Sequence, residues 1–484
     1  MTTNIAPKNL LLILSDEHNP GVIGCAGHSE VMTPNLDALA ASGTRFTNAT
    51  CASPICVPAR AALATGRNIF ETGYWDNVDA YDGKTPSWHH VLRTAGHEVF
   101  SIGKLHYRGW EGDDYGFSET LLPMHIHGGC GEVKMLLRNP PASIGDGSNM
   151  LNSAKAGRSD YNKYDHEITT RAMEWLQERG RSIRPEKPWV LLVSLVAPHF
   201  PLTVPQEFFD LYRGKRLSLP KGYMFGVDDS AHPFLQQYSR SSGYNMHFKN
   251  EDDVRQALCG YYGLVSYLDH NVGAILACLK HAGLDGETRV LYTSDHGDNA
   301  GARGLWGKST MYKESVGVPM MLSGPDVASG RTVSAAVSHI DVYNTVLDAV
   351  GHHEKDSTAS PRSQSLFGSL DPERITVAEY HTIGSHSAVF MVQDDRTKYV
   401  RYCDHPAQLF DLEADPQELN NIAANPDAKG RVAFWEARLQ SLCNPDAIDQ
   451  RAKQRQQQLI EFYGGEEAIR NGKNIGGYTP SPTH

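Results

Sequence analysis

The chain of 484 residues is long enough for more than one domain, and its 40% hydrophobic and 21% charged residues are ordinary for a soluble globular protein. Its formal net charge of −11 argues against nucleic acid as the main partner, because binding to phosphates needs a basic face. No apolar run approaches the roughly 20 residues that cross a bilayer. The apolar run at 9–15 continues into Asp16 and has no small-residue cleavage site. We therefore predict a cytoplasmic protein with no membrane or nucleic-acid partner.

Strand-like runs alternate with helical stretches along the first 350 residues, which predicts parallel β–α–β units. In chain order, we expect a strand at 9–15, a helix at 33–43, a helix and then a strand across 86–103, a helix at 165–180, a strand at 188–198, a long helical region at 251–284 and a strand at 287–295. The predicted fold class is α/β, with a mostly parallel sheet that is flanked by helices.

The pattern changes after about residue 351. Residues 352–365 are polar and aperiodic, which is typical of a linker or surface loop. Beyond them, short strand signals at 374–381, 387–393 and 397–403 predict a small antiparallel sheet, and 426–443 predicts a helix that covers it. The segment 463–484 has too few apolar residues to form a core. We predict that this tail docks on a neighbouring subunit of a homodimer or homotetramer.

Titratable side chains follow four of the predicted strands. They are Asp16 after the first, Lys104 and His106 after the second, His199 after the third, and Asp295 with His296 after the fourth. Ligands bind outside the carboxyl ends of the strands in parallel α/β sheets. Independent surface residues are the alternative, but four such strand ends in one chain favour a single site. Two carboxylates and an imidazole suit Ca²⁺, Mg²⁺ or Mn²⁺ better than a metal that prefers thiolates.

Several cationic and proton-transfer groups belong to the same set. They are Arg60, Lys104, His106, His199 and Lys308. A metal ion and several cations that converge on one pocket favour an anion. The expected substrate is a sulfate or phosphate ester, because charge on the transferring group must be stabilised.

The segment CVPAR, residues 56–60, places a cysteine where a helix is expected to begin. Free N–H groups and the helix dipole attract anions there and lower the pKa of a thiol. Three interpretations of Cys56 compete: a buried structural cysteine, a thiolate nucleophile, and the precursor of another group. The loop of tyrosine phosphatases needs an arginine six positions after the cysteine, and Ala62 stands there, so that form of thiolate chemistry is excluded.

The pattern Cys-x-Pro-x-Arg resembles the signature at which sulfatases have their cysteine oxidised to formylglycine. Ala59 stands where the family usually has serine. Other sulfatase-like segments follow in the expected order: TPNLDALAASGTRFTNAT at 33–50, GK-x-H at 103–106, PH-x-P at 198–201, SDHGD at 294–298, GLWGK at 304–308, and QLFDLEADPQELNNIA at 408–423. The resemblance spans nearly the whole chain. It implies an alkaline-phosphatase-like catalytic domain at 1–365, a C-terminal α+β subdomain at 366–462, and the tail at 463–484.

The resemblance also implies the roles of the site residues. One divalent cation, Ca²⁺ or alternatively Mn²⁺, would be bound by Asp16, Asp295, His296 and the modified Cys56. Arg60 would hold the formylglycine, with Lys104 and His106 beside it, while His199 and Lys308 would contact the sulfate and the leaving oxygen. Glu17 and His296 depart from the Asp and Asn of many sulfatases. The Asp–His pair resembles the branch of choline sulfatases and phosphonate monoester hydrolases.

The implied mechanism uses a hydrated aldehyde, which offers two geminal hydroxyl groups. One attacks sulfur while the alcohol leaves with a proton from His199 or Lys308. The second then loses its proton to His106, and sulfate is expelled. A formylglycine-generating enzyme is the implied partner that converts Cys56.

The residues leave the substrate open between sulfate esters, phosphonate monoesters or phosphodiesters, and choline sulfate. Phosphonate monoesters, phosphodiesters and choline sulfate would all use the same expected site. A catalytically inactive metal-binding module is a further alternative, but it would have lost Lys or His at the strand ends. Residues 73–83 resemble the region in which choline sulfatases place an asparagine that contacts the substrate, which implies Asn77 as a substrate-binding residue beside His199 and Lys308. An aromatic cage for choline would draw on Tyr74, Trp75, Trp110 and Glu379. Aromatic and acidic side chains in loops more often pack or stay on the surface, and that interpretation is favoured here. His125 and His127 are expected to be ordinary loop histidines, and Asp298 is expected to orient a metal ligand.

Overall fold

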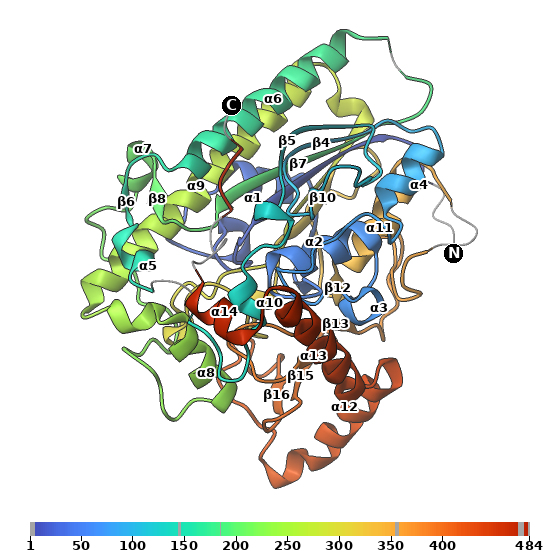
Figure 1. Ribbon diagram of the computed structural model, residues 1–484. Coiled ribbons are helices and arrows are strands. Elements are labelled where there is room, and N and C mark those ends of the chain that lie inside the picture. Colours follow the sequence, from blue (N-terminus) through green and yellow to red (C-terminus); the bar gives the residue numbers. More distant parts are fainter. Residues whose placement is uncertain (1–4, 144–146, 184, 354–357, 473–478, 483–484) are drawn as a thin grey trace.

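The computed structural model describes residues 5–143, 147–183, 185–353, 358–472 and 479–482. Its central sheet has eight strands in the order β11–β2–β10–β9–β1–β7–β4–β5 (Figure 1). In that order they span Arg331–Val333, Gly43–Phe46, Met320–Ser323, Thr288–Ser294, Asn9–Asp16, Val190–Pro198, Val99–Lys104 and Glu119–Met124. Strands β9, β1, β7, β4 and β5 are parallel, and β10 pairs antiparallel with β9 and β2. The predicted mostly parallel α/β sheet is confirmed.

The central strand β1 separates two hydrophobic cores. Leu11 and Ile13 belong to one core, and Leu10, Leu12 and Leu14 belong to the other. Successive side chains of a strand point to opposite faces of its sheet. An unbroken apolar run is therefore what a strand needs when helices cover both faces.

Helices cover the two faces of the sheet. The first core is completed by α1 (Pro34–Ala41), α6 (Asp160–Arg181), α7 (Gln206–Phe209) and α9 (Glu251–His281), and the second by α2 (Cys56–Thr65), α4 (Trp88–Thr94) and α11 (Ile340–Ala349). The long helices α6 and α9 lie side by side (Figure 1). Shorter elements are α3 (Ile69–Thr72), α5 (Asn149–Asn152), α8 (Pro233–Ser242), α10 (Lys313–Val316), and the strand pairs β3 (Ala49–Thr50) with β12 (Val337–Ser338) and β6 (Lys155–Ala156) with β8 (Thr203–Val204).

The C-terminal region forms a separate antiparallel sheet, β13–β14–β15–β16, whose strands span Thr376–Tyr380, Val389–Gln393, Thr397–Tyr402 and Gln408–Asp411. Helices α12 (Lys429–Leu442), α13 (Pro445–Phe462) and α14 (Glu466–Asn471) follow it. This region lies below the main sheet in Figure 1. Its core includes Trp435 and Leu439 and continues into Ala62 of α2. The C-terminal sheet therefore packs against the helix that begins at Cys56.

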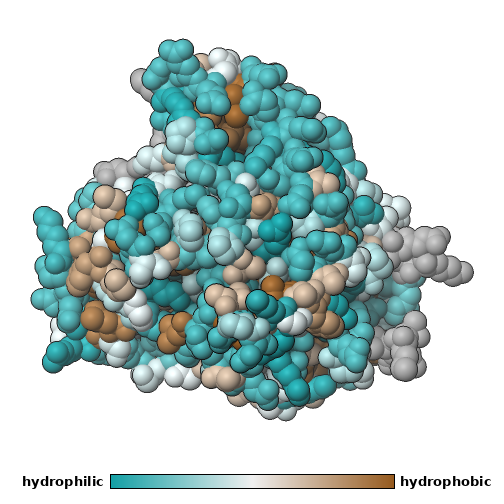
Figure 2. Space-filling view, turned by 90° about the horizontal axis from the view of Figure 1, so that it is seen from below, coloured by the Kyte–Doolittle hydropathy of each residue, from teal (hydrophilic) through white to brown (hydrophobic). Residues whose placement is uncertain are grey.

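The face of the molecule in Figure 2 is covered mainly by hydrophilic residues, with hydrophobic residues in small separate groups. Among the described residues, no helix combines the length and the apolar character that crossing a bilayer requires.

Candidate active site

The predicted strand-end residues lie at one edge of the central sheet. Asp16 is the last residue of β1 and Lys104 the last of β4, while Asp295 directly follows β9 and His199 directly follows β7. Lys104 and Asp16 form an ion pair, although neighbouring strand β7 lies between their strands. The parallel arrangement thus brings together residues that are far apart in the sequence.

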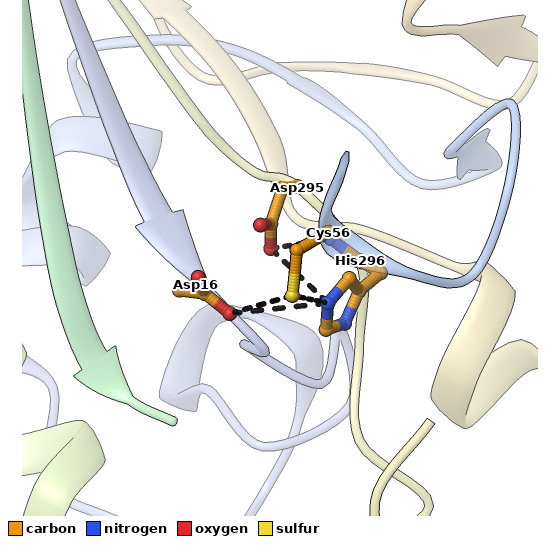
Figure 3. Close-up of side chains that lie close together, drawn as sticks. All are labelled: Asp16, Cys56, Asp295 and His296. Atoms are coloured by element: carbon orange, nitrogen blue, oxygen red, sulfur yellow. Dashed lines mark hydrogen bonds and ion pairs between the residues drawn. The ribbon is translucent and has the colours of Figure 1, made fainter. Parts of the chain in front are cut away.

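Four potential metal ligands form a compact cluster: Asp16, Cys56, Asp295 and His296 (Figure 3). One donor atom from each lies within 4.8 Å of all the others, and all four residues are buried. The Sγ of Cys56 is 3.1 Å from Nε2 of His296 and 3.8 Å from Oδ1 of Asp16. The other ring nitrogen of His296 lies 2.9 Å from the carbonyl of Gly297, which can only accept. Nδ1 therefore carries the hydrogen, and the lone pair of Nε2 faces the cluster.

Arg60 binds the carboxylates of this cluster from inside the protein. Its Nε donates to Asp295 at 2.8 Å and its Nη2 to Asp16 at 3.2 Å. Its Nη1 donates to the Lys104 carbonyl at 2.6 Å and to Oγ of Ser194 at 2.9 Å. Burial alone would raise the pKa of Asp16, but the positive groups around it, with Lys104 the strongest, hold that pKa well below its usual value. The Asp16 side chain therefore stays ionised, the form in which a carboxylate binds a metal ion.

The position of Cys56 agrees with the sequence, but its expected acidity was wrong. Cys56 is the first residue of α2 and is only 2% exposed. Burial, with the Asp16 carboxylate as the next cause, raises the pKa of its thiol to about 12, even though the Lys308 ammonium is 3.3 Å from the sulfur. Loss of solvation outweighs the helix dipole here. The thiol stays protonated at neutral pH, which argues against a thiolate nucleophile.

Lys308, which contacts Cys56, meets His199 at Glu17. The Oε2 of Glu17 is 3.1 Å from Nζ of Lys308 and 3.3 Å from Nε2 of His199. Burial raises the pKa of Glu17 to about 8, although Lys308 opposes the shift. Burial, followed by the charge of Lys308, also lowers the pKa of His199 well below its usual value. Since Nδ1 of His199 is 2.6 Å from the Phe200 carbonyl, Nε2 of the neutral ring is an acceptor, and a protonated Glu17 can donate to it.

His106 contacts the C-terminal tail. Its Nε2 is 3.1 Å from Oγ1 of Thr479, and the Thr479 carbonyl accepts a 2.7 Å hydrogen bond from Tyr161. Burial, and next the charge of Lys104, lowers the pKa of His106 well below its usual value. His106 has a φ of 55°, and Glu17 has a φ of 70°. Such left-handed backbone is uncommon for residues other than glycine and often occurs at functional sites.

A pocket opens over these groups and is lined by most of the predicted site residues. They are Cys56, Asn77, Lys104, His106, His199 and Lys308. Asn77 accepts a 3.1 Å hydrogen bond from the backbone N–H of Val57, so it satisfies a free donor at the start of α2. The sequence analysis missed other lining residues: Glu132, Tyr161, Tyr238, Tyr244 and Thr479. They lie outside the central strands and follow no recognisable pattern, so the sequence offered no signal for them.

The residues suggested for a choline cage do not line this pocket. Glu379 is bound to His381 at 2.7 Å, and Trp75 packs on the same imidazole. Tyr74 donates to Asp82 at 3.0 Å, and Trp110 is on the surface. Of the two alternatives, packing or surface exposure describes these four side chains, and the choline cage does not.

Three further sequence candidates also lie outside the pocket lining: His125, His127 and Asp298. The ring of His125 packs against Tyr115. The Asp298 carboxylate accepts a 2.5 Å hydrogen bond from the backbone of Ala300, so it shapes the loop after β9.

Comparisons with known proteins agree with this geometry. A family model described as Sulfatase matches residues 8–352, and one described as N-sulphoglucosamine sulphohydrolase, C-terminal, matches residues 301–444. The chain is 31% identical over 485 residues to a choline-sulfatase of Rhizobium meliloti (strain 1021), covering 98% of this chain and 93% of that protein. It is 29% identical to arylsulfatase K of Bos taurus, covering 86% of this chain and 78% of that protein.

Solved structures show the same fold. The phosphonate monoester hydrolase of Agrobacterium radiobacter superimposes with a TM-score of 0.71 at 23% identity, covering 90% of this chain and 95% of that chain. The chain belongs to the sulfatase family and is a sulfuric ester hydrolase.

Proposed function

We propose that the protein hydrolyses small alkyl or aryl sulfate esters through a formylglycine derived from Cys56 and one bound divalent cation. The observation that carries the proposal is the position of Cys56, whose sulfur lies between the metal-type donors and the Lys308 ammonium. A thiol with a pKa of about 12 is a poor nucleophile. The same position suits an oxidised side chain whose oxygens would lie where the sulfur does.

The buried cluster fits a divalent cation. Two carboxylates and the free Nε2 of His296 supply hard donors, which favours Ca²⁺ and leaves Mn²⁺ as the alternative. When bound, the ion neutralises the carboxylates and stabilises negative charge on oxygens beside it. The aldehyde hydrate supplies two hydroxyl groups, one that takes the sulfo group and one that allows its release.

The surrounding side chains would bind the ester and move the protons. Lys104 and Lys308 place two ammonium groups around the anion, while Arg60 keeps the carboxylates of the cluster in position. His106 is proposed as the base that takes the proton during sulfate release, because its low pKa keeps the ring neutral.

Lys308 and His199 are the candidates for the proton donor to the leaving alcohol. Both contact Oε2 of Glu17 in the pocket, Lys308 at 3.1 Å and His199 at 3.3 Å. Glu17 therefore links the two candidates and can pass a proton between them. Asn77 lines the same pocket and is the proposed substrate-binding residue beside them.

Hydrolysis of phosphonate monoesters or phosphodiesters is the second candidate. It is favoured by His296 at the metal cluster and by the shared fold with the phosphonate monoester hydrolase. Choline O-sulfate is a third candidate, favoured by the identity to the choline-sulfatase. Rates on 4-nitrophenyl sulfate, on an aryl phosphonate ester and on choline O-sulfate would separate the three.

The decisive experiment is mass spectrometry of the peptide that contains Cys56, after expression with a formylglycine-generating enzyme. We expect an aldehyde at position 56 and activity that rises with the converted fraction. Full activity in a protein whose Cys56 is entirely unmodified would refute the mechanism. Cys56→Ala should remove turnover and keep the fold.

A further inference from the structure

The carboxylate of Glu132 has no use in the reaction proposed above. Its side chain lines the same pocket as Cys56 and is only 2% exposed. Within the described part of the chain, neither carboxylate oxygen has a hydrogen-bond partner. Buried carboxylates are nearly always paired, since leaving one without partners costs free energy. A buried acceptor on a pocket wall therefore indicates a group that arrives with the substrate.

Glu132 is held close to the reacting centre by its neighbours. A side chain at Gly131 would meet the Asn77 carbonyl at 2.1 Å, and Gly131 has a φ of 56°, so only glycine fits there. Asn77 in turn binds the backbone of Val57, the residue after Cys56. The segment 130–132 thus packs directly on the loop that supports the start of α2.

The short helix after Glu132, Val133–Leu136, anchors this segment from the other side. Val133 and Leu136 pack with Ile460 of α13 and Ile469 of α14. The backbone N–H of Met135 donates to the Glu132 carbonyl at 2.9 Å. Glu132 is therefore fixed by its backbone, and its carboxylate is free to bind a ligand.

The pocket lining carries charged groups of both signs. The wall around Cys56 carries Lys104 and Lys308, which suit the sulfate. The lining also includes apolar and aromatic side chains: Ile126, Met135, Phe200, Tyr238, Tyr244 and Ile383. Burial raises the pKa of Glu132, and the positive charge that opposes this shift is that of Lys134. A dipolar ester, anionic at one end and cationic at the other, matches a lining that holds both lysines and a carboxylate.

We propose that Glu132 binds a protonated amine on the alcohol portion of the sulfate ester, so that the preferred substrates are aminoalkyl sulfates with at least one N–H. A carboxylate only accepts hydrogen bonds, and its two free oxygens need donors. A quaternary ammonium supplies charge but no N–H, and a hydroxyl supplies a donor but no charge. A protonated amine supplies both, and charge-assisted hydrogen bonds are the stronger kind. The proposal rests on the proposed sulfatase function of this site.

The test compares kcat/KM of the converted enzyme on four kinds of ester: ω-aminoalkyl sulfates with two to four carbons, choline O-sulfate, 2-hydroxyethyl sulfate and ethyl sulfate. We expect the best aminoalkyl sulfate to exceed ethyl sulfate by about 10- to 100-fold, from the strength of hydrogen bonds to charged groups. In Glu132→Gln this ratio should fall by about tenfold or more. Glu119→Gln, which changes an exposed carboxylate on β5, is the matched control and should keep the ratio.

Three kinetic results would overturn the proposal. One is an unchanged ratio in Glu132→Gln. Another is an equal loss on all four kinds of ester, which would indicate a structural role. The third is a wild-type preference for the hydroxyalkyl or quaternary ester over every aminoalkyl sulfate.

A stability measurement does not depend on turnover. Glu132→Met removes a buried carboxylate that lacks partners, so we expect its melting temperature to equal or exceed that of the wild type. A clear decrease would show that the carboxylate stabilises the fold and would contradict the proposal. Binding of 3-aminopropyl sulfate to Cys56→Ala, measured by calorimetry, should weaken about tenfold or more on adding Glu132→Gln. Because this binding measurement needs no turnover, it tests the role of Glu132 even if no sulfate ester is hydrolysed. Absence of hydrolysis would refute the proposed function itself.

Discussion

The Nε of Arg60 donates to Oδ2 of Asp295 at 2.8 Å, and both side chains are almost completely buried. The same guanidinium reaches Asp16 at 3.2 Å, so one rigid cation holds two carboxylates of the proposed metal cluster. A planar guanidinium can bind both at once because its donors are fixed in a fork. The arginine of the CVPAR segment therefore holds two carboxylates of the cluster in position.

Replacing Arg60 with alanine should strongly destabilise the protein. The change leaves two buried carboxylates without this partner, and breaking a buried ion pair typically costs about 3–5 kcal/mol. Denaturant unfolding of the protein without added metal measures the loss. Arg93→Ala is the matched control, since it breaks an exposed ion pair with Asp114 and should cost about 1 kcal/mol or less. Equal losses in the two variants would contradict the supporting role of Arg60.

Replacing Lys308 with methionine should lower kcat by about 10²- to 10⁴-fold if Lys308 protonates the leaving alcohol. The loss should be larger for an alkyl sulfate than for 4-nitrophenyl sulfate, because the nitrophenolate leaves without a proton. Steady-state rates on both esters make the comparison. Lys163→Met, at an exposed lysine of α6, is expected to leave the rates unchanged. A loss of the same size on both esters would assign Lys308 to sulfate binding alone.

The acid limb of the pH–rate profile should lie below pH 6.5. His106 must be neutral to act as a base, and burial together with the charge of Lys104 lowers its pKa well below the usual value of about 6.5. The ring therefore loses its proton at a lower pH than a free histidine, and activity should persist as the pH falls through 6.5. Profiles of kcat for the wild type and His106→Gln check this. A wild-type limb at or above pH 6.5 would rule out His106 as the base that titrates there.

Chelation of the metal should abolish turnover and lower the melting temperature. A cation that binds only the folded protein stabilises it by about 2.7 kcal/mol when its concentration is 100 times its dissociation constant. Titrating the metal-free protein with Ca²⁺ and Mn²⁺ should raise the melting temperature and identify the better ligand. Asp295→Asn should weaken this response, because it removes one of the clustered donors. An identical response in that variant would place the ion elsewhere.

The tail contact at the pocket should influence catalysis modestly. Thr479→Val keeps the shape of the side chain but removes the hydroxyl that lies 3.1 Å from Nε2 of His106. A typical hydrogen bond contributes about 0.5–1.5 kcal/mol, so we expect kcat/KM to fall about 2- to 12-fold. Removal of residues 473–484 should cause at least the same loss, since it also removes the partner of Tyr161. Unchanged kinetics in both variants would show that the tail contact has no catalytic role.

The same truncation tests the predicted oligomer. Docking of the tail on a neighbouring subunit remains a prediction; in the described residues, Thr479 contacts His106 and Tyr161 of its own chain. Residues 473–478 and 483–484 lie outside the described residues. Light scattering at micromolar concentration should give a dimer or tetramer for the full chain and a smaller species after truncation. A full chain that is monomeric under these conditions would refute the oligomer prediction.

Much of the fold could be predicted because it depends on local patterns. The strands that end near Asp16 and His199 are nearly continuous apolar runs, and parallel strands place their carboxyl ends at one edge. The sequence analysis did not single out α13, Pro445–Phe462, because a helix with so many charged and amide side chains shows little apolar periodicity.

The site was less completely predictable. Tyr244 and Thr479 reach the pocket from segments with no periodic pattern, and Tyr74 and Trp75 failed as cage candidates because nearness in sequence does not determine where a side chain points.

By itself, the sequence determined the order of the strands along the chain, the residue types at their ends and the CVPAR segment, because these are local properties. Only the tertiary structure decided the acidity of Cys56, since burial by the whole fold outweighs the dipole of a single helix. Only the tertiary structure could place Glu132 in the same pocket as Lys104 and Lys308, because that relationship joins segments with no local signal. The proposed catalytic residues follow the strand ends, whereas the substrate selectivity that we propose arises from how distant segments pack around them.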